Sequence, residues 1–351
     1  MATHRGWLRA VPGSVAMPSR VLVTGGTGFI AGWCIAELLE AGHEVVTSVR
    51  APAREQEVRV AVGADSASRL RFAVADLTSD AGWDDAVEAC EYVLHVASPL
   101  SGDGDDAAAI ITAAREGTVR VLAAAARGGV RRVVLTSSCA AATPHSSQLT
   151  GTVDETCWTD ADESGLAPYR RSKVLAERAA WDFVARDAAD LELTTVLPAA
   201  VFGPARSPSA LGSLQIIAAL LDGSALAIPR LGFEVVDVRD VAAAHLLAMT
   251  APAAAGERFI VSGDVLWFGD VADILRTRLG ADASRVPTES LTDDDFRAVA
   301  QVSPQLATLL PLLGRELQHS SAKAQRVLGW QPRPAAETIV DSARCILDAW
   351  G

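Results

Sequence analysis

Aromatic residues are scarce in this chain, and it has no long apolar run. Only 5% of its 351 residues are Phe, Trp or Tyr, which favours helices packed closely on a sheet. No stretch of about 18 or more apolar residues occurs, so we expect no membrane-spanning helix. The first 18 residues hold His4, Arg5 and Arg9 beside a short apolar run, which falls short of a signal peptide. We expect residues 1–18 to form a flexible tail.

Cysteine is also sparse, and its spacing excludes two classes of protein. The five cysteines are scattered, odd in number and without a CxxC pair: Cys34, Cys90, Cys139, Cys157 and Cys345. This pattern is typical of reduced thiols in a cytoplasmic protein rather than of a disulfide framework or a metal site. We therefore expect a cytoplasmic location and no metal.

Positive charge is in deficit. The net charge is −12, the sequence pI is near 5.0, and no useful cluster of Lys and Arg occurs. These values argue against a nucleic-acid partner. Half of the chain is hydrophobic, so it can bury a substantial core as one large domain or two modest ones.

A glycine-rich turn follows the first predicted strand. Residues 20–24 form a β-branched apolar run, and residues 25–32 read Gly-Gly-Thr-Gly-Phe-Ile-Ala-Gly before a predicted helix over 29–40. Strand, glycine turn and helix in this order predict a dinucleotide site. Gly25 would allow the tight turn, and Gly28 would let the backbone approach a pyrophosphate at the helix N-terminus. The alternative is a glycine turn without a ligand.

The end of the second predicted strand indicates which dinucleotide binds. Residues 44–49 are followed by Arg50. An acidic residue there would bind the ribose 2′-hydroxyl of NAD, whereas an arginine suits the 2′-phosphate of NADP. Arg54 lies nearby and could assist, and the alternative is that Arg50 is only a solvated charge. We expect NADPH/NADP as the cofactor, with NADH less favoured.

Asp76 follows the third predicted strand, residues 70–74. Its carboxylate could accept a hydrogen bond from the adenine amino group. It could instead cap a helix that begins near Ser79 or Asp80. The two roles are compatible, so both stay open.

Further apolar runs complete the pattern of a sheet. Strands are predicted over 92–97, 132–136 and 191–197, and a long helix over about 106–127. His95 lies inside a strand and is expected to be a packed core histidine. Strands that alternate with helices predict an α/β fold, a Rossmann-type doubly wound parallel sheet.

Tyr169 and Lys173 are four residues apart, on a predicted helix that can begin at Pro168. This spacing places both side chains on one helix face, where an ammonium would favour the phenolate. Lowering the tyrosine pKa by about three units would need roughly 4 kcal/mol, so we expect a site partly closed to water. Ser138 follows a buried strand and would reach the same edge of the sheet.

The composition changes after residue 204. Residues 205–212 are rich in Ser, Pro and Ala and predict a mobile flap, and helices are predicted near 267–279 and 335–349. We predict three parts: the tail; an NADP-binding domain over 19–203 plus about 235–262; and a smaller C-terminal α/β substrate lobe over 204–234 and 263–351.

Together these motifs resemble the extended short-chain dehydrogenase/reductase superfamily. Within it, the chain is most similar to the group of dihydroflavonol reductases, cinnamoyl-CoA reductases and microbial aldehyde and ketone reductases. The resemblance runs from about residue 19 to 349. It rests on residues 24–30, 49–50, 75–77, 95–99, 133–138, 154–158 (Asp-Glu-Thr-Cys-Trp), 169–173, 201–204, 237–241 and 328–332.

The resemblance implies the site residues. Ser138, Tyr169 and Lys173 would be catalytic: Ser138 polarises the carbonyl, Tyr169 protonates its oxygen, and Lys173 lowers the tyrosine pKa and binds the nicotinamide ribose. The hydride would leave from the pro-S face. The implied cofactor-binding residues are Gly25, Thr27, Gly28, Phe29, Ile30, Arg50, Asp76, Leu77, Val96, Ala97, Ser98, Thr136, Lys173, Pro198, Ala199 and Val201. The implied substrate pocket consists of Pro99, Cys139, Thr143 and Phe202.

Three departures from the family pattern bear on the prediction, two on the class of substrate and one on the cofactor. Thr143 stands where plant dihydroflavonol reductases carry an asparagine, which argues against a flavonoid. Residues 170–172 (Arg-Arg-Ser) differ from the aromatic-rich signature of cinnamoyl-CoA reductases, which argues against a CoA thioester. Glu57 occupies a position near which a lysine often supports NADP binding, which weakens the NADP prediction.

We therefore predict an NAD(P)H-dependent carbonyl reductase, or alcohol dehydrogenase, that reduces a hydrophobic ketone or aldehyde to an alcohol. The alternatives are an NAD-dependent nucleotide-sugar epimerase or dehydratase and a non-catalytic dinucleotide sensor. A small-molecule carbonyl compound is the expected partner, and the protein is expected to be a monomer or homodimer. The natural substrate and the stereochemical preference cannot be predicted from the sequence.

Overall fold

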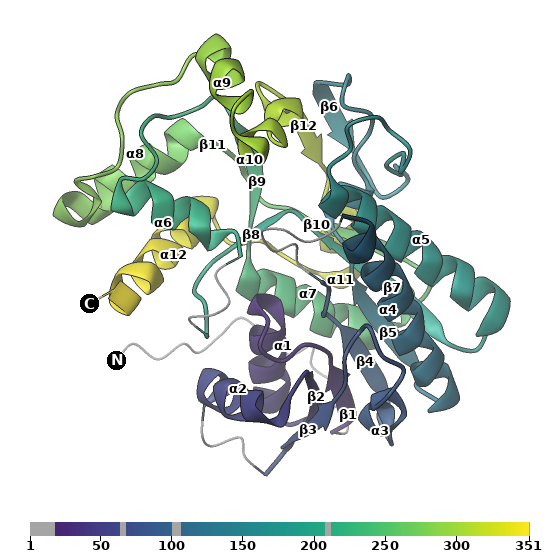
Figure 1. The fold of residues 1–351 in the computed structure, drawn as a ribbon. Coiled ribbons are helices and arrows are strands. Elements are labelled where there is room, and N and C mark those ends of the chain that lie inside the picture. The colour runs from purple at the N-terminus through teal and green to yellow at the C-terminus, as the bar shows by residue number, and fades with distance from the viewer. Residues whose placement is uncertain (1–17, 64–67, 100–106, 208–211, 351) are drawn as a thin grey trace.

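The computed structural model describes residues 18–63, 68–99, 107–207 and 212–350 (Figure 1). The predicted tail therefore lies outside the described residues, apart from residue 18. The middle of the predicted flap, residues 208–211, also lies outside them.

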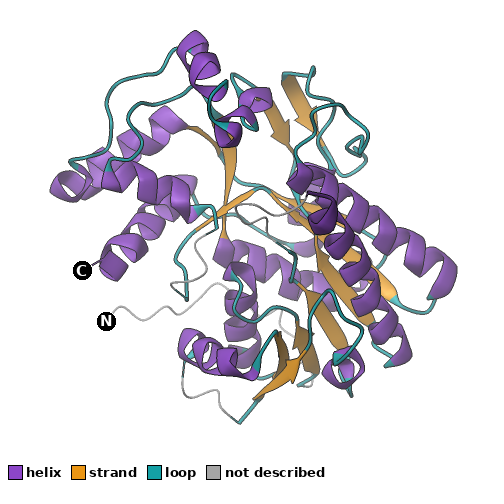
Figure 2. Cartoon of the chain, viewed as in Figure 1, coloured by secondary structure: helices purple, strands orange, loops and turns teal. Residues whose placement is uncertain are grey.

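A seven-stranded parallel sheet forms the centre of the molecule (Figure 2). Apart from β3 (Leu70–Val74), its strands are almost entirely buried, as expected when helices cover both faces of a parallel sheet. This arrangement confirms the predicted doubly wound α/β fold. In spatial order the strands are β10 (Arg258–Val261), β7 (Glu192–Pro198), β5 (Arg132–Thr136), β4 (Tyr92–His95), β1 (Arg20–Val23), β2 (Glu44–Val49) and β3 (Leu70–Val74).

Helices pack against the two faces of this sheet through separate apolar clusters. Figure 1 shows α4 and α5 side by side on one face, with α1 and α7 on the other. The first face carries α3 (Trp83–Val87), α4 (Ala107–Arg127) and α5 (Pro168–Asp187). The second carries α1 (Phe29–Glu40), α2 (Glu55–Val62), α7 (Val238–Thr250) and α11 (Ala322–Leu328).

The helix expected near Ser79 or Asp80 begins later, at Trp83. Gly82 precedes it with a φ of +85°, a left-handed conformation that an α-helix cannot include. Asp76 consequently caps no helix. One of its carboxylate oxygens instead accepts hydrogen bonds from the Thr78 N–H at 2.8 Å and from the Thr78 hydroxyl at 2.6 Å.

The second half of the chain builds a smaller lobe over one end of the sheet, with its own apolar core. Both helices predicted there are present, as α8 and α12. The lobe contains β8 (Ala200–Phe202), α6 (Leu214–Asp222), β9 (Gly232–Asp237), β11 (Val265–Trp267), α8 (Phe268–Leu279), α9 (Asp293–Ala300), α10 (Pro304–Ala307) and α12 (Ala335–Trp350). A two-stranded pair, β6 (Thr150–Val153) with β12 (Glu316–His319), borders it.

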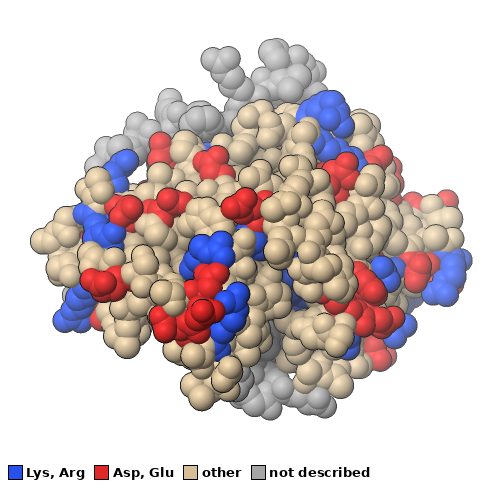
Figure 3. All heavy atoms as spheres, turned by 90° about the horizontal axis from the view of Figure 1, so that it is seen from above, with Lys and Arg blue, Asp and Glu red and all other residues tan. Residues whose placement is uncertain are grey.

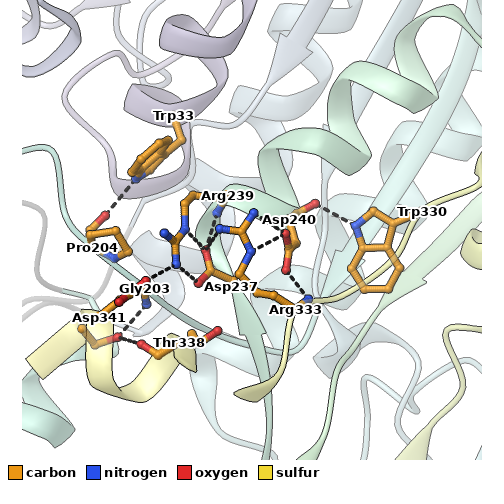
Figure 4. A network of polar contacts seen from close by, with 11 residues as sticks. Trp33, Gly203, Pro204, Asp237, Arg239, Asp240, Trp330, Arg333, Thr338 and Asp341 are labelled. Carbon is orange, nitrogen blue, oxygen red and sulfur yellow. Dashed lines mark hydrogen bonds and ion pairs between the residues drawn. The ribbon is translucent and has the colours of Figure 1, made fainter. Parts of the chain in front are cut away.

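An ion-pair network ties this lobe to the helices under the sheet (Figure 4). Arg239, in the first turn of α7, pairs with Asp237 at 2.7 Å and with Asp341 of α12 at 2.7 Å. Arg333, just before α12, pairs with Asp240 at 2.9 Å. The motif at 237–241 therefore links α7 to the C-terminal segment.

Charges of both signs are interspersed on the face of the molecule seen from above, with no continuous basic surface there (Figure 3). Within the described ranges, no helix is both long and apolar enough to cross a membrane.

Candidate active site

A cavity of about 1230 Å³ opens where the parallel strands end. Its walls include the residues that follow the carboxyl ends of β1, β2, β3, β4 and β5, where open α/β sheets bind their ligands. Pockets for one drug-sized ligand measure about 300–1000 Å³. The cavity therefore has room for a dinucleotide together with a small second molecule.

The cavity brings together nearly all the residues predicted for the site. Every predicted catalytic and cofactor-binding residue lines it, as do Pro99, Cys139 and Thr143. Phe202 does not line it, because this side chain is fully buried in the core of the smaller lobe. The Phe202 ring stacks on the Phe233 ring, with 5.4 Å between the ring centroids. Of these two residues, Phe233 lines the cavity.

Ser138, Tyr169 and Lys173 meet at one end of the cavity. Ser138 lies in extended backbone after β5, and its hydroxyl forms a hydrogen bond with the Tyr169 hydroxyl. Lys173 lies one helical turn beyond Tyr169, with its ammonium 6.0 Å from the centre of the tyrosine ring. That ammonium donates to the Thr136 carbonyl oxygen at 3.4 Å. The two hydroxyl groups are thus hydrogen-bonded to each other, and one cation lies beside the tyrosine ring.

The pKa of Tyr169 differs from the expectation. Burial of the phenol oxygen raises it, and the hydrogen bond from Ser138 offsets only part of that rise. The residue as a whole is 38% exposed. The predicted lowering by Lys173 is therefore absent from this structure, and the phenol stays protonated at neutral pH.

Lys173 is only 7% exposed, and burial lowers the pKa of its ammonium from 10.5 to about 8. The carboxylate of Glu177, one helical turn further along α5, acts in the opposite direction. The ammonium is thus charged at neutral pH, although its buried environment disfavours the charged form.

The glycine turn fits a dinucleotide phosphate. Gly25 has a φ of +72°, and a Cβ atom there would lie 2.9 Å from the Cβ of Ala97. Gly28 is the N-cap of α1 and supplies no side chain to the free N–H groups of the first turn. Those N–H groups are therefore open to an anion.

Thr24 shapes the opposite side of this turn. Its hydroxyl accepts hydrogen bonds from the N–H groups of Val96 at 3.0 Å and Ala97 at 2.9 Å. It also bonds to Nδ1 of His95 at 2.9 Å. His95 is 1% exposed, and burial lowers its pKa to about 3, so it is a neutral core histidine as expected.

Two arginines near the second strand differ in whether they form an ion pair. Arg54 forms an ion pair with Glu57 at 2.7 Å. Arg50 is exposed and lines the cavity, without a hydrogen bond or ion pair to any described residue. Its charge helps the hydrogen bonds from Thr78 to hold the pKa of Asp76 below its usual value. Arg50 is therefore the freer cation for a phosphate, and Arg54 is partly neutralised.

A buried carboxylate on α5 has no signal in the sequence motifs. Glu177 is 1% exposed and accepts hydrogen bonds from Ser137 at 2.6 Å and Thr195 at 2.8 Å. Its ion pair with Arg258 of β10 measures 2.8 Å. The guanidinium of Arg258 in turn lies 3.7 Å from the ring centre of Trp158. This network fixes α5 against the edge strand of the sheet.

The narrow motif at 154–158 belongs to the same network. Arg258 donates to the carbonyl oxygens of Glu155 at 2.5 Å and Cys157 at 2.9 Å. The Glu155 carboxylate accepts from the N–H of Ile260 at 3.0 Å. None of the motif's residues lines the cavity, so it supports the site from outside.

The far wall of the cavity comes from segments without a recognisable motif. Thr143 bonds to His319 of β12 at 3.0 Å, and His319 pairs with Glu234 of β9 at 2.6 Å. Arg170 and Arg315 line the same end. Thr143 was predicted from the resemblance; of the other residues named here, only Arg170, next to Tyr169 in sequence, offered a signal that could have found it.

Comparisons with known proteins identify the family of the chain and several reductases that are similar to it. Residues 21–262 match the model of the NAD dependent epimerase/dehydratase family. A cinnamoyl-CoA reductase of Medicago truncatula is 37% identical over 300 residues, 83% of this chain and 90% of that protein. A ketoreductase of Aspergillus niger is 34% identical over 303 residues, 80% of this chain and 88% of that one.

A solved structure extends the likeness to the whole fold. The crystal structure of yeast methylglyoxal/isovaleraldehyde reductase complexed with NADPH superposes with a TM-score of 0.81 at 28% identity. The match covers 95% of this chain and 99% of that one.

Proposed function

We propose that this chain, which belongs to the NAD dependent epimerase/dehydratase family, is an NADPH-dependent carbonyl reductase. The family model covers residues 21–262, most of the chain. The observation that carries the proposal is the meeting of Ser138, Tyr169 and Lys173 beside a cavity with room for two ligands. Reductases among the similar proteins support the same reading.

The side chains divide the work on the carbonyl group. Ser138 donates a hydrogen bond to the carbonyl oxygen, and Tyr169 transfers its proton to that oxygen as negative charge develops. The raised pKa of Tyr169 suits a proton donor, because the phenol remains loaded at neutral pH. Lys173 stabilises the phenolate that remains after the transfer. Bound NADPH would supply the hydride to the carbonyl carbon.

The cofactor assignment rests on the glycine turn and Arg50. The first turn of α1 would hold the pyrophosphate, and Arg50 would bind the 2′-phosphate. The similar yeast reductase was crystallised as a complex with NADPH, which supports the same cofactor here. The segments 19–203 and about 235–262 would form this cofactor domain, and 204–234 with 263–351 the substrate lobe.

The deciding experiment measures NADPH and NADH oxidation by the pure protein against aryl ketones, β-ketoesters and aldehydes. We expect turnover with NADPH, and a loss of about 10²- to 10⁴-fold in Tyr169→Phe, since a general acid contributes that much. Failure of every carbonyl compound to oxidise either cofactor would refute the proposal. Protein that purifies with stoichiometric NAD would favour the epimerase instead.

A further inference from the structure

Two arginines face the substrate end of the cavity without a carboxylate partner. Arg170 follows Tyr169 on α5, and Arg315 lies just before β12; both line the cavity. Among the described residues, the acceptors of Arg315 are neutral: the carbonyl oxygens of Gln148 at 3.0 Å, Pro144 at 3.0 Å and His145 at 3.2 Å. The Nε atom of Arg170 is buried and has no hydrogen-bond partner among the described residues.

The acids nearby are engaged elsewhere. Glu163 acts on both arginines through space and forms no ion pair with either; its Oε1 accepts from the Ser146 N–H at 2.9 Å and lies 3.7 Å from Nε2 of His145. Glu234 lines the same cavity, and both of its carboxylate oxygens are taken by His319. In the part of the chain that the structure describes, no carboxylate forms an ion pair with either guanidinium, and Glu163 offsets their positive charge only through space.

The local backbone adds to this positive field. Arg170 lies in the first turn of α5, which contains no acidic residue and which carries the positive end of the helix dipole. Burial and the neighbouring charge of Arg315 both lower the pKa of Arg170, a sign that the cation is held where it is disfavoured. Such a concentration of positive charge is the setting in which a bound anion gains most.

Building on the proposed function, we propose that the carbonyl substrate carries an anionic group, a carboxylate or a phosphate, that Arg170 and Arg315 bind while Ser138 and Tyr169 hold the carbonyl oxygen. The carboxylate of a small acid is one source of this anionic group. A phosphate of a larger acyl carrier is the other source of the same chemistry.

Two matched substrate pairs test this proposal. The first pair is 4-formylbenzoate and its neutral isostere 4-formylbenzamide. The second is an acyl-CoA thioester and the N-acetylcysteamine thioester of the same acyl group, which lacks the phosphates. The quantity measured is the ratio of kcat/KM values, anionic over neutral, with NADPH as the reductant.

We expect a ratio well above one in the wild type for the benzoate pair. Arg170→Gln should lower it about 10- to 100-fold, the usual effect of a charge-assisted hydrogen bond. Among the described residues, the Arg170 guanidinium has no ion-pair partner that this substitution would strand. Arg171→Gln is the matched control, since Arg171 shares the turn but does not line the cavity, and it should keep the ratio.

The outcomes separate the two proposals. A preference that depends on Arg170 in the thioester pair alone would identify the anion as a phosphate of the carrier. Ratios near one in both pairs, or a ratio that Arg170→Gln leaves unchanged, would overturn the anionic substrate while the reductase stands. If no member of either pair oxidises NADPH and the wider carbonyl panel also fails, the reductase itself is refuted.

Discussion

The buried ammonium of Lys173 should lower the free energy of unfolding of the protein. Its pKa falls from 10.5 to about 8 on folding, so the folded protein disfavours the charged form. Each pKa unit corresponds to about 1.4 kcal/mol, which makes the cost about 3 kcal/mol at pH 7. Because the folded pKa lies below the unfolded one, this cost shrinks as the pH rises from about 8 and disappears above about 10.5. At pH 9 about 2 kcal/mol remains.

Lys173→Met should therefore raise the free energy of unfolding by about 3 kcal/mol at pH 7 and by about 2 kcal/mol at pH 9, while it abolishes reduction. Urea denaturation at the two pH values measures both differences. Lys323→Met is the matched control, since Lys323 is partly exposed and paired with Glu257 at 2.6 Å; it should bring no gain. A Lys173→Met protein that is less stable than the wild type at both pH values would refute the reasoning.

Three further outcomes can be measured. Arg50→Ala should raise the KM for NADPH about 10- to 100-fold and leave the KM for NADH nearly unchanged; equal effects on both would remove Arg50 as the phosphate ligand. Arg258→Leu should destabilise the protein by about 3–5 kcal/mol in urea denaturation, because it leaves the buried Glu177 carboxylate unpaired; a loss below about 1 kcal/mol would contradict this. The kcat/KM for reduction should decline as the pH rises through about 8, when Lys173 loses its proton, and Lys173→Arg should not show that decline.

Local patterns predicted the central sheet well. Strands β2, β3 and β5 have the predicted bounds, because each is an apolar run flanked by polar or turn residues. The edge strand β10 was not predicted, although residues 258–261 (Arg-Phe-Ile-Val) are a mostly apolar run between Gly256 and Gly263. A run this short cannot be told from another buried segment by its pattern alone. The predicted start of α3 was wrong, because Gly82 adopts a left-handed conformation and the helix begins only after it.

The site divides in the same way. Its cofactor half follows strand ends with sequence motifs, and every predicted residue there lines the cavity. Its substrate half is built by tertiary contacts: Arg315 and His319 reach it from the last tenth of the chain. Phe202 was assigned wrongly because the side chains of a strand alternate between faces; its neighbour Val201 lines the cavity, and Phe202 enters the core.

The pairing of Glu177 with Arg258 also sets an order of events during synthesis. Arg258 is translated 81 residues after Glu177. At about 5–20 residues per second, the ribosome needs roughly 4 to 16 seconds to supply it. Until then the Glu177 carboxylate would have hydrogen bonds from Ser137 and Thr195 but no cation beside it. Helix α5 is complete near the midpoint of the nascent chain, and we expect its buried network to be completed only after β10 has been made.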